Sequence, residues 1–510
     1  MKNEVIIIGS GLGGLACGLI LAKNGYKVTI LEQGSQIGGC LQCFRRGDAT
    51  FETGMHFVGS AAEGQTLHRL LKYFDILNDI HLSQLDEKGY EVVQLAGERY
   101  QYANGRDAFI QQMLCYFPDS QSDLNRYFDI VETVAAASAL NSLKPAGGIE
   151  NAMQYQLRSI DDVLQETIKD EQLRNVLVGN LPLYAAEKGK TPFATHAFVM
   201  DFYNRSAYRI AGGSDTVATA MAKKIEGLGG RIVTNCKVTH IDFDAQNNAT
   251  ITIKEGKRGQ EIVQNVGNAY IISAIHPTRT AEIVTSPLLR PAWKSRIKTL
   301  RNTIGAFTVY LKFKKNAVRY MNYNFYSYNK KTPWNCENYT QDTWPEGYLY
   351  MHMKQEPTAI DLQSDQNLQF STSGIIISYM RFEEVSRWIG TTIGHRGADY
   401  EEFKQRKAEK LIERLCQDFP ELRGNIERYY TSTPLTYLNY TGTAEGSMYG
   451  IAKDISATSN RVHHRTKVPN LLLSGQNINS HGILGVLVGA IVTCSEIIGQ
   501  DEMTQQINRL

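Results

Sequence analysis

The chain has 510 residues, of which 42% are hydrophobic and 21% charged, an ordinary composition for a folded globular protein. This length predicts about two to four domains and excludes a chain that is mainly disordered, collagen-like or coiled coil. The 54 Lys and Arg residues against 52 Asp and Glu leave a net charge of +2, so charge gives no indication of nucleic-acid binding.

The first predicted elements are a buried strand from Val5 to Ile8 and a helix over residues 13–24. No charged residue occurs from Val5 to Ala22, a length that also suits a membrane span or a signal peptide. The glycines at positions 9, 11, 13, 14 and 18 are poor choices for a lipid-facing helix. We therefore expect a strand, a tight turn and a helix inside a folded domain.

The turn reads Gly9-Ser10-Gly11-Leu12-Gly13-Gly14, which matches the GxGxxG pattern of dinucleotide-binding proteins. Gly9 allows the tight turn, Gly11 lets backbone amides approach a pyrophosphate, and Gly14 lets the helix pack against the strand. The positive end of the helix would face the phosphates. A second predicted strand ends at Glu32, where a carboxylate can accept hydrogen bonds from a ribose diol. Together these features predict a bound dinucleotide.

A double glycine, Gly38-Gly39, follows Glu32 after a short loop, and residues 51–59 read FETGMHFVG. This arrangement resembles flavoproteins related to amine oxidases and phytoene desaturases. Within that family the stretch GGCLQCFRRGDATFETGMHFVG looks most like retinol saturases and carotenoid isomerases, in which the equivalent stretch reads roughly DTGIHYIG. The resemblance implies that the glycine pair contacts FAD phosphates and that the TGMH segment lies beside the isoalloxazine ring.

The C-terminal part repeats the order of strand, glycine loop and helix. Asn470 to Gly475 is a short apolar run that ends in glycine, and a helix of small residues follows Gly482. Amides near Gly482 to Gly485 would hold the ribityl chain or the flavin O2 edge. Family members usually carry a carboxylate just after the first glycine of this fingerprint, whereas this chain has the amide of Asn477.

A central segment is similar to the family's return to the FAD domain. It comprises a loop at residues 208–215, a helix to about residue 228, strands at residues 231–241 and 250–254, and a strand at residues 269–277. The resemblance implies that the backbone of Val238 contacts the adenine and that Ala274 lies near the flavin.

The resemblance therefore implies an α/β fold, α+β overall, with non-covalently bound FAD. We expect a Rossmann-type FAD-binding domain made of residues 1–75, 205–285 and 462–510, and a discontinuous substrate domain of antiparallel sheet and helices made of residues 76–204 and 286–461. The residues expected to contact FAD are Gly9, Ser10, Gly11, Leu12, Gly13, Gly14, Glu32, Gln33, Gly38, Gly39, Cys40, Gly54, Met55, His56, Val238, Ala274, Gly475, Gln476, Gly482, Ile483, Leu484 and Gly485.

In the expected substrate domain, apolar spacings of three and four predict helices at residues 123–134, 159–167 and 170–178. A strand is predicted at residues 305–313 and a helix near residues 403–419. The aromatic stretch from Thr191 to Tyr203 has two interpretations. Stripes of this kind are more often part of the core, whereas the resemblance implies that the stretch lines a channel leading to the flavin.

The family's chemistry implies an FAD-dependent oxidoreductase that acts on carbon–carbon bonds of a long apolar isoprenoid or polyene, by saturation, desaturation or cis–trans isomerisation. His56, His196 and Tyr208 are candidate proton-handling residues, and Arg209 is a candidate anchor. Two alternatives stay open: an amine oxidase-like flavoenzyme, and a flavin-free prenyl- or lipid-binding carrier, as in the related Rab GDP-dissociation inhibitors.

No second GxGxxG follows a strand, so we expect a separate electron donor or acceptor. We also expect a cytoplasmic protein, peripheral to a membrane at most, without a nucleic-acid partner. Cys40 and Cys43 form a CxxC without a second ligand pair, so no metal is expected, and the two are either structural or a redox pair. The basic stretch from Pro291 to Arg301 is either a plain solvated helix or a patch that contacts a membrane surface.

Overall fold

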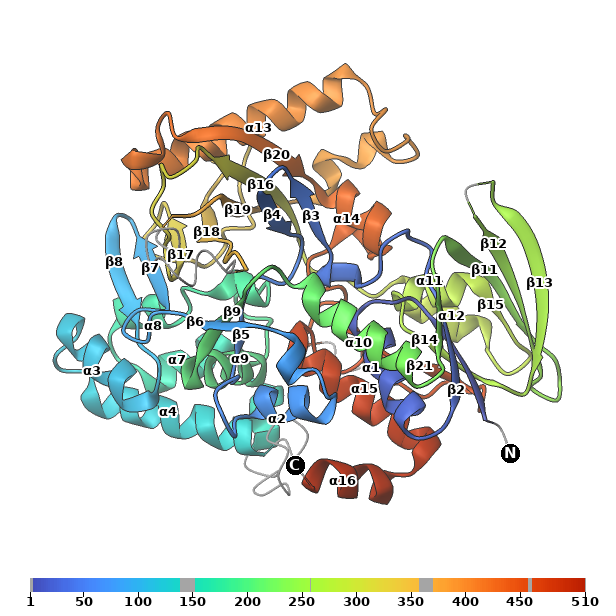
Figure 1. Cartoon of the computed structure of the whole chain (residues 1–510). Coiled ribbons are helices and arrows are strands. Elements are labelled where there is room, and N and C mark those ends of the chain that lie inside the picture. The colour runs from blue at the N-terminus through green and yellow to red at the C-terminus, as the bar shows by residue number, and fades with distance from the viewer. Residues whose placement is uncertain (1–2, 138–151, 257, 357–369, 457–460, 510) are drawn as a thin grey trace.

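The computed structural model describes residues 3–137, 152–256, 258–356, 370–456 and 461–509 (Figure 1). A parallel five-stranded sheet lies at its centre in the order β10–β2–β1–β14–β21. Its strands are β1 (Glu4–Ile8), β2 (Lys27–Leu31), β10 (Arg231–Val233), β14 (Tyr270–Ser273) and β21 (Leu471–Leu473). All five come from the three segments that the sequence assigns to the dinucleotide-binding domain.

The charge-free N-terminal run is a core helix. In α1 (Leu12–Lys23) every residue from Leu12 to Ala22 is buried. The helix packs beside α10 (Asp215–Gly227) and α15 (Gly482–Ile498). Its lack of charge therefore reflects burial on all sides. In the described part of the chain, no helix is both long and apolar enough to cross a membrane.

The single strand expected at residues 231–241 is in fact two strands in different sheets. β10 ends at Val233, and β11 (Cys236–Phe243) begins after Asn235, which has a left-handed φ of 53°. β11 belongs to a four-stranded sheet with β12 (Ala249–Glu255), β13 (Gln260–Gly267) and β15 (Val284–Thr285). The left-handed residue redirects the chain, a turn that asparagine tolerates and that a strand pattern does not reveal.

The second large sheet has seven strands in the order β20–β16–β19–β18–β17–β7–β8. All neighbours are antiparallel except β17 and β7. The strands are β7 (Glu91–Leu95), β8 (Glu98–Tyr102), β16 (Gly305–Phe313), β17 (Asn324–Tyr328), β18 (Gly347–His352), β19 (Ser373–Met380) and β20 (Ile426–Ser432). The β7–β8 hairpin lies in a segment for which the sequence predicts mainly helices.

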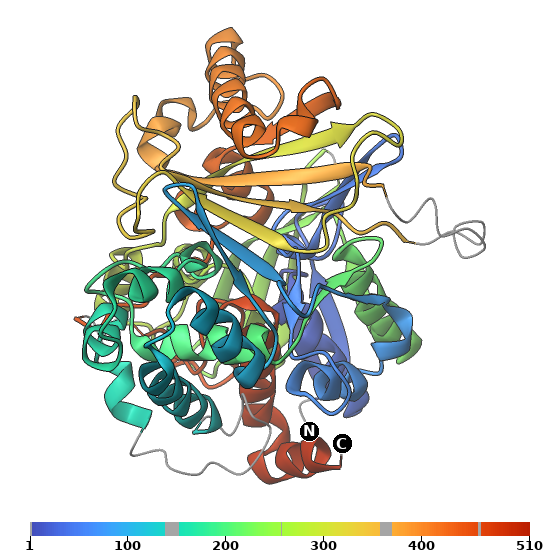
Figure 2. The ribbon, with the colours of Figure 1, turned by 90° about the vertical axis from the view of Figure 1, so that its left-hand side faces the viewer.

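Helices cover both faces of this sheet (Figure 2). One face carries α3 (Arg106–Tyr116), α4 (Gln121–Ala136), α7 (Ile160–Thr167), α8 (Glu171–Leu177) and α9 (Phe193–Arg205), and the other carries α13 (Ala398–Asp418). The predicted helices at residues 123–134, 159–167 and 170–178 agree with α4, α7 and α8, whereas α13 begins at Ala398, before the expected start. Because both faces are covered, all eight residues of β19 are buried.

A small sheet, β5–β9–β6, joins the two large parts. It consists of β5 (Val58–Gly59), β6 (Leu82–Gln84) and β9 (Ala207–Ile210). The other elements are the hairpin of β3 (Cys43–Arg46) and β4 (Ala49–Glu52), and the helices α2 (Thr66–Tyr73), α11 (Pro277–Ile283), α12 (Pro291–Lys298), α14 (Pro434–Thr441) and α16 (Gln500–Asn508).

Two apolar residues of the basic stretch around α12 are buried in the protein interior. Ile297 and Leu300 are 0% and 6% exposed. Lys294 Nζ donates a hydrogen bond to the Val284 carbonyl oxygen at 2.5 Å, and Arg301 pairs with a neighbouring acid. Membrane contact through this helix stays a prediction.

A buried carboxyl group lies between the seven-stranded sheet and its helical layer. Glu91 is 0% exposed; Tyr326 Oη donates to its Oε1 at 2.9 Å and Asn180 Nδ2 to its Oε2 at 3.1 Å. Burial raises the pKa of Glu91 to about 7, because two hydrogen bonds only partly replace the lost hydration of the anion.

The elevated pKa of Glu91 predicts that Glu91→Gln stabilises the protein at alkaline pH. Below the ordinary carboxyl pKa of 4.5 the group is neutral in both folded and unfolded chains. Between that value and about 7 the unfolded chain loses its proton first, so the free energy of unfolding falls as pH rises. Denaturant unfolding should show similar stability of the two proteins at pH 4.5 and an advantage for Glu91→Gln of roughly 3 kcal/mol at pH 8.5. An equal difference at both pH values would contradict a neutral Glu91.

Candidate functional site

Three glycine-bearing segments meet at the carboxyl ends of the parallel strands. A Cβ atom on Gly14 would lie 2.0 Å from the carbonyl oxygen of Gly9. One on Gly13 would lie 2.9 Å from the Cα of Gly475, and one on Gly39 would lie 3.1 Å from the Cα of Gly11. Side chains at Gly13, Gly14 and Gly39 would therefore force these segments apart.

Gly11 differs from those glycines, because a Cβ atom there would meet nothing within 4 Å. The Gly38 N–H donates to the Ser10 carbonyl oxygen at 2.9 Å, which fixes the double glycine beside the turn. Helix α1 begins at Leu12, directly after Gly11, so the positive N-terminal end of the helix lies at the glycine turn. The open space at Gly11, bordered by backbone and a helix N-terminus, fits the pyrophosphate of a dinucleotide.

Glu32 lies at the end of β2, against this turn, and is 8% exposed. Its Oε2 accepts hydrogen bonds from Ser10 N at 2.9 Å and Ser10 Oγ at 2.7 Å, and its Oε1 accepts one from Gly34 N at 2.7 Å. A carboxylate held in this position fits the predicted ribose contact. Gln33, also predicted to bind the cofactor, is exposed.

Two residues from the central segment, Val238 and Ala274, lie beside the glycine turn, and their contacts with FAD stay a prediction. The Cys236 N–H donates to the Glu32 carbonyl oxygen at 2.8 Å, which brings the start of β11, with the buried Val238, next to the ribose position. The Ala274 N–H donates to the Ile8 carbonyl oxygen at 2.9 Å. A Cβ on Gly14 would lie 3.3 Å from the Ala274 side chain, so Ala274 borders the glycine turn.

The C-terminal loop carries Gly475 and Gln476 beside Gly13 and leads to the exposed Gly482 at the start of α15. Ile483 and Gly485 anchor this helix start: Ile483 is buried, and a Cβ on Gly485 would lie 2.6 Å from the Ser480 Cβ. Leu484 is only partly buried. The loop therefore presents backbone at the place where the family resemblance puts the flavin.

The amide that replaces the family's usual carboxylate has a structural partner. Asn477 is 7% exposed, and its Oδ1 accepts a hydrogen bond from Ile451 N at 2.8 Å. A Cβ on Gly450 would lie 2.0 Å from that Oδ1. Asn477 therefore fixes the loop at residues 449–453 against the C-terminal glycine loop.

Cys40 and Cys43 are reduced and largely buried. Burial raises the pKa of Cys40 to about 11, and burial together with the charge of Glu52 raises the pKa of Cys43. A Cβ on Gly54 would lie 3.0 Å from the Cys40 Cβ, so Gly54 and Cys40 pack against each other. Redox exchange needs a thiolate, which these raised pKa values disfavour, so we interpret both cysteines as structural.

His56 of the TGMH segment belongs to a buried group of polar side chains. We call this group the His56 cluster; it is made of Glu52, His56, Arg209, Tyr320 and Asn324. The His56 Nδ1 lies 3.6 Å from Glu52 Oε2, and Glu52 is 4% exposed. Burial raises the pKa of Glu52, and the nearby His56 and Arg209 oppose that rise. Met55, which precedes His56, packs partly against the core around α1.

Arg209 holds this cluster to the seven-stranded sheet. It is 1% exposed; its Nη1 donates to the His56 carbonyl oxygen at 3.1 Å and its Nη2 to Asn324 Oδ1 at 2.7 Å. Four buried atoms of the cluster have no hydrogen-bond partner among the described residues: His56 Nδ1, Arg209 Nε, Tyr320 Oη and Asn324 Nδ2. Such a concentration of unsatisfied polar atoms is typical of a site that binds water or ligand groups.

The other two candidate proton-handling residues lie apart from this cluster. His196 is 0% exposed, and its Nε2 and Nδ1 lie 2.7 Å and 2.8 Å from the hydroxyl oxygens of Tyr127 and Tyr184. Burial lowers its pKa to about 3, so it is neutral in the core, and we no longer propose it as a proton donor. Tyr208 precedes Arg209 on β9, so its side chain leaves the strand on the opposite face and packs, partly buried, against the core of the dinucleotide-binding part.

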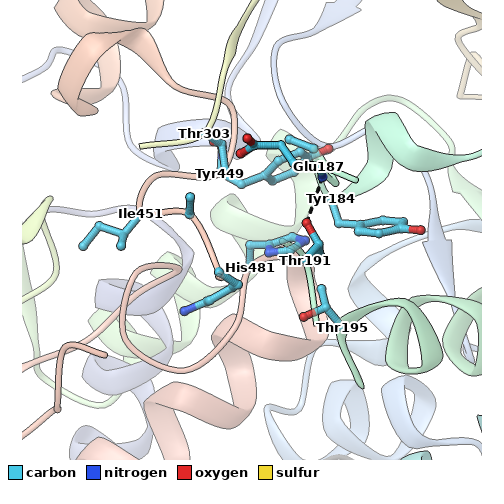
Figure 3. A pocket seen from close by; sticks show the side chains of 11 residues that line it. Tyr184, Glu187, Thr191, Thr195, Thr303, Tyr449, Ile451 and His481 are labelled. Atoms are coloured by element: carbon cyan, nitrogen blue, oxygen red, sulfur yellow. Dashed lines mark hydrogen bonds between the residues drawn. The ribbon is translucent and has the colours of Figure 1, made fainter. Parts of the chain in front are cut away.

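A pocket lies between the C-terminal glycine loop and the helical layer (Figure 3). The ring of His481, which precedes Gly482, lies 4.5 Å from the ring of Tyr449 between centroids. Thr191, Thr195 and Lys453 also line it. In the described part of the chain, no group of three His, Cys, Asp or Glu side chains could hold a metal ion.

The sequence analysis missed Glu52, Tyr449 and Lys453. A glutamate at the end of the strand ATFE was a visible signal, because a charge that ends a buried strand needs a partner. Tyr449 and Lys453 lie in a loop whose position depends on Asn477, and no local pattern identifies them.

Comparisons with known proteins agree with this site. All-trans-retinol 13,14-reductase of Homo sapiens is 26% identical over 98% of this chain and 86% of that protein. Prolycopene isomerase 2 of an Oncidium hybrid cultivar is 22% identical over 88% of this chain and 75% of its own length. An oxidoreductase of Methanosarcina mazei shares the fold, with a TM-score of 0.61 and 15% identity over 96% of this chain and 99% of that one.

The family model described as flavin containing amine oxidoreductase matches residues 12–498. That match begins at Leu12, so it includes the second half of the glycine turn, and it also includes Glu32, the TGMH segment and the C-terminal glycine loop. The chain therefore belongs to the family of flavin-containing amine oxidoreductases and is an FAD-dependent oxidoreductase.

Proposed function

We propose that this enzyme acts on carbon–carbon double bonds of a long apolar polyene of the retinoid or carotenoid kind, by saturation, desaturation or cis–trans isomerisation. The observation that carries the proposal is the His56 cluster beside the predicted flavin position, in a chain similar over nearly its full length to a protein named retinol 13,14-reductase. When bound, FAD supplies hydride exchange at N5.

The protein's own residues provide binding and proton handling in this proposal. Glu52 and Arg209 hold His56 from two sides, through its side chain and its backbone. Phe57, which follows His56, has its ring centroid 4.4 Å from that of Tyr203, and we propose that these rings form part of an aromatic wall beside His56. His56 would exchange a proton with the substrate carbon, and the aromatic wall would bind the polyene chain.

The amine oxidase-like alternative is not favoured, because the curated relatives that match most of the chain are named for a retinol reductase and a prolycopene isomerase. Likeness to amine oxidases of known structure shows the fold alone. The flavin-free carrier is not proposed either, because the glycine turn and Glu32 are intact. We also propose a separate electron donor or acceptor, since the sequence has one GxGxxG after a strand.

The proposed function predicts how FAD is bound. The purified protein should show flavin absorption bands, and heat denaturation should release them into the supernatant, because we propose non-covalent binding. Gly11→Ala should fold with the melting temperature of the wild-type apoprotein yet retain little FAD, since its methyl group would enter the open space at the turn. Gly14→Ala is the contrasting variant: its Cβ would clash with Gly9, so the apoprotein itself should lose about 1–3 kcal/mol of stability. Equal FAD content in Gly11→Ala and wild type would place the pyrophosphate elsewhere.

The proposed role of His56 in proton exchange can be tested by substitution. His56→Ala should keep bound FAD but lose about 100-fold or more in turnover of a polyene, because a positioned proton donor contributes a factor of this order. Glu52→Gln, which removes the charge facing His56 Nδ1, should lower turnover with FAD retained. His240→Ala, at a half-exposed histidine on β11, is the matched control and should be unchanged.

Turnover is measured anaerobically by following polyene absorption with reduced and with oxidised enzyme, which separates saturation, desaturation and isomerisation. Unchanged turnover in His56→Ala would remove His56 from the mechanism. The absence of any polyene reaction in both redox states would contradict the proposed substrate class.

A further inference from the structure

The pocket beside the C-terminal glycine loop contains a cation that no acid neutralises. Lys453 is largely buried among the residues that line it. Among the described residues, no carboxylate lies within ion-pair distance of its Nζ, and the charged group that acts on it is Arg461, a second cation. Burial and Arg461 lower the pKa of Lys453 to about 8, since the ammonium loses hydration without gaining a partner.

Two acids beside this pocket are already paired with other cations. Glu187 lines it and forms an ion pair with Lys190 at 2.8 Å and a second one with Arg301. Asp454 also pairs with Arg301, at 3.3 Å. These pairs leave the positive charge of Lys453 in excess, so the pocket favours an anion.

The rest of the lining is suited to a polar group at the end of a rigid chain. Thr191, Thr195 and Thr303 contribute hydroxyl groups, and His481 and Tyr449 contribute flat ring faces (Figure 3). Thr191 Oγ1 accepts a hydrogen bond from Glu187 N at 2.8 Å, and Tyr449 Oη donates to the Pro182 carbonyl oxygen at 2.9 Å, so part of this wall is held in place. A hydrocarbon end would leave the buried ammonium without a partner, which is unfavourable.

The pocket adjoins the place where the reaction is proposed. His481 directly precedes Gly482, the first residue of α15, whose N-terminal turn is predicted to contact the flavin. Ile451, which also lines the pocket, donates its N–H to Asn477 Oδ1 at 2.8 Å, and Asn477 follows Gly475 and Gln476 in the C-terminal glycine loop. A polyene that extends from His56 along this loop would have one end at the pocket.

We propose that this pocket binds the carboxylate end of a polyene, with Lys453 as its ion-pair partner, so that the preferred substrate is a polyene acid rather than a neutral alcohol or hydrocarbon. This inference rests on the proposed function, because it assumes that the polyene chain occupies the adjoining site.

The test compares two ligands with the same carbon skeleton, all-trans-retinoic acid and all-trans-retinol, on the FAD-loaded full-length enzyme. Dissociation constants are measured by the change in flavin absorption or by quenching of protein fluorescence. Retinoic acid should bind on the order of 30-fold more tightly than retinol, the factor expected when a buried charge gains its partner. Equal affinities in the wild-type enzyme would overturn the proposal without any variant.

Variants of Lys453 separate charge from packing. Lys453→Met should weaken retinoic acid binding by a similar factor and leave retinol binding within about twofold, whereas Lys453→Arg should retain the preference for the acid. Lys237→Met, at an exposed lysine on β11, is the matched control and should change neither value. An equal loss for both ligands in Lys453→Met would show a packing effect and contradict the ion pair.

Binding and turnover distinguish this inference from the function on which it rests. A preference for retinoic acid with no reaction in either redox state would contradict the polyene reaction but support the anion site. Turnover of retinol and retinoic acid with equal affinities would support the reaction and exclude the carboxylate pocket.

Discussion

The close approach of three backbone segments at the carboxyl ends of β1, β2 and β21 is the constraint on which the cofactor site depends. Gly14 must lack a side chain because the Gly9 carbonyl oxygen occupies that space, and Gly13 must lack one because Gly475 lies there. These contacts join parts of the chain more than 450 residues apart in sequence. The cofactor site therefore exists only when both ends of the chain are folded together, and Glu32 completes it by bonding back to Ser10.

Outside that site, the substrate part of the molecule combines a large aromatic core with buried polar groups whose neutral forms are favoured by burial. The pKa of Glu91 is raised to about 7, and that of His352 is lowered to about 3 by burial and by Arg209. Neutral groups of this kind fix side-chain positions through hydrogen bonds without adding a charge beside an apolar substrate. Glu52 and Lys453 differ, because each has charged or unsatisfied neighbours next to the proposed reaction site.

Much of the fold was predictable, since it depends on local patterns. Charge-free and alternating runs identified β1, α1, β2, β14 and β21, and helical spacing identified α4, α7 and α8. The β7–β8 hairpin and the division of residues 231–241 into two strands were missed, because each depends on pairing with strands remote in sequence or on a single left-handed residue. The domain boundaries stay a prediction, although β6 and β9 pair across the expected border.

The sequence by itself determined the cofactor chemistry. Glycines act through what they lack, and a missing side chain is visible in sequence wherever the backbone must come close to a phosphate or another strand. Only the tertiary structure decided which polar residues belong to the reaction site. His196 and His56 look alike as isolated histidines, but one bridges two tyrosines in the core and the other faces a glutamate beside the flavin position. The pairing of Glu187 with Lys190 and Arg301, which leaves Lys453 without a carboxylate partner among the described residues, likewise depends on contacts between remote segments, because electrostatic balance is set by distance in space.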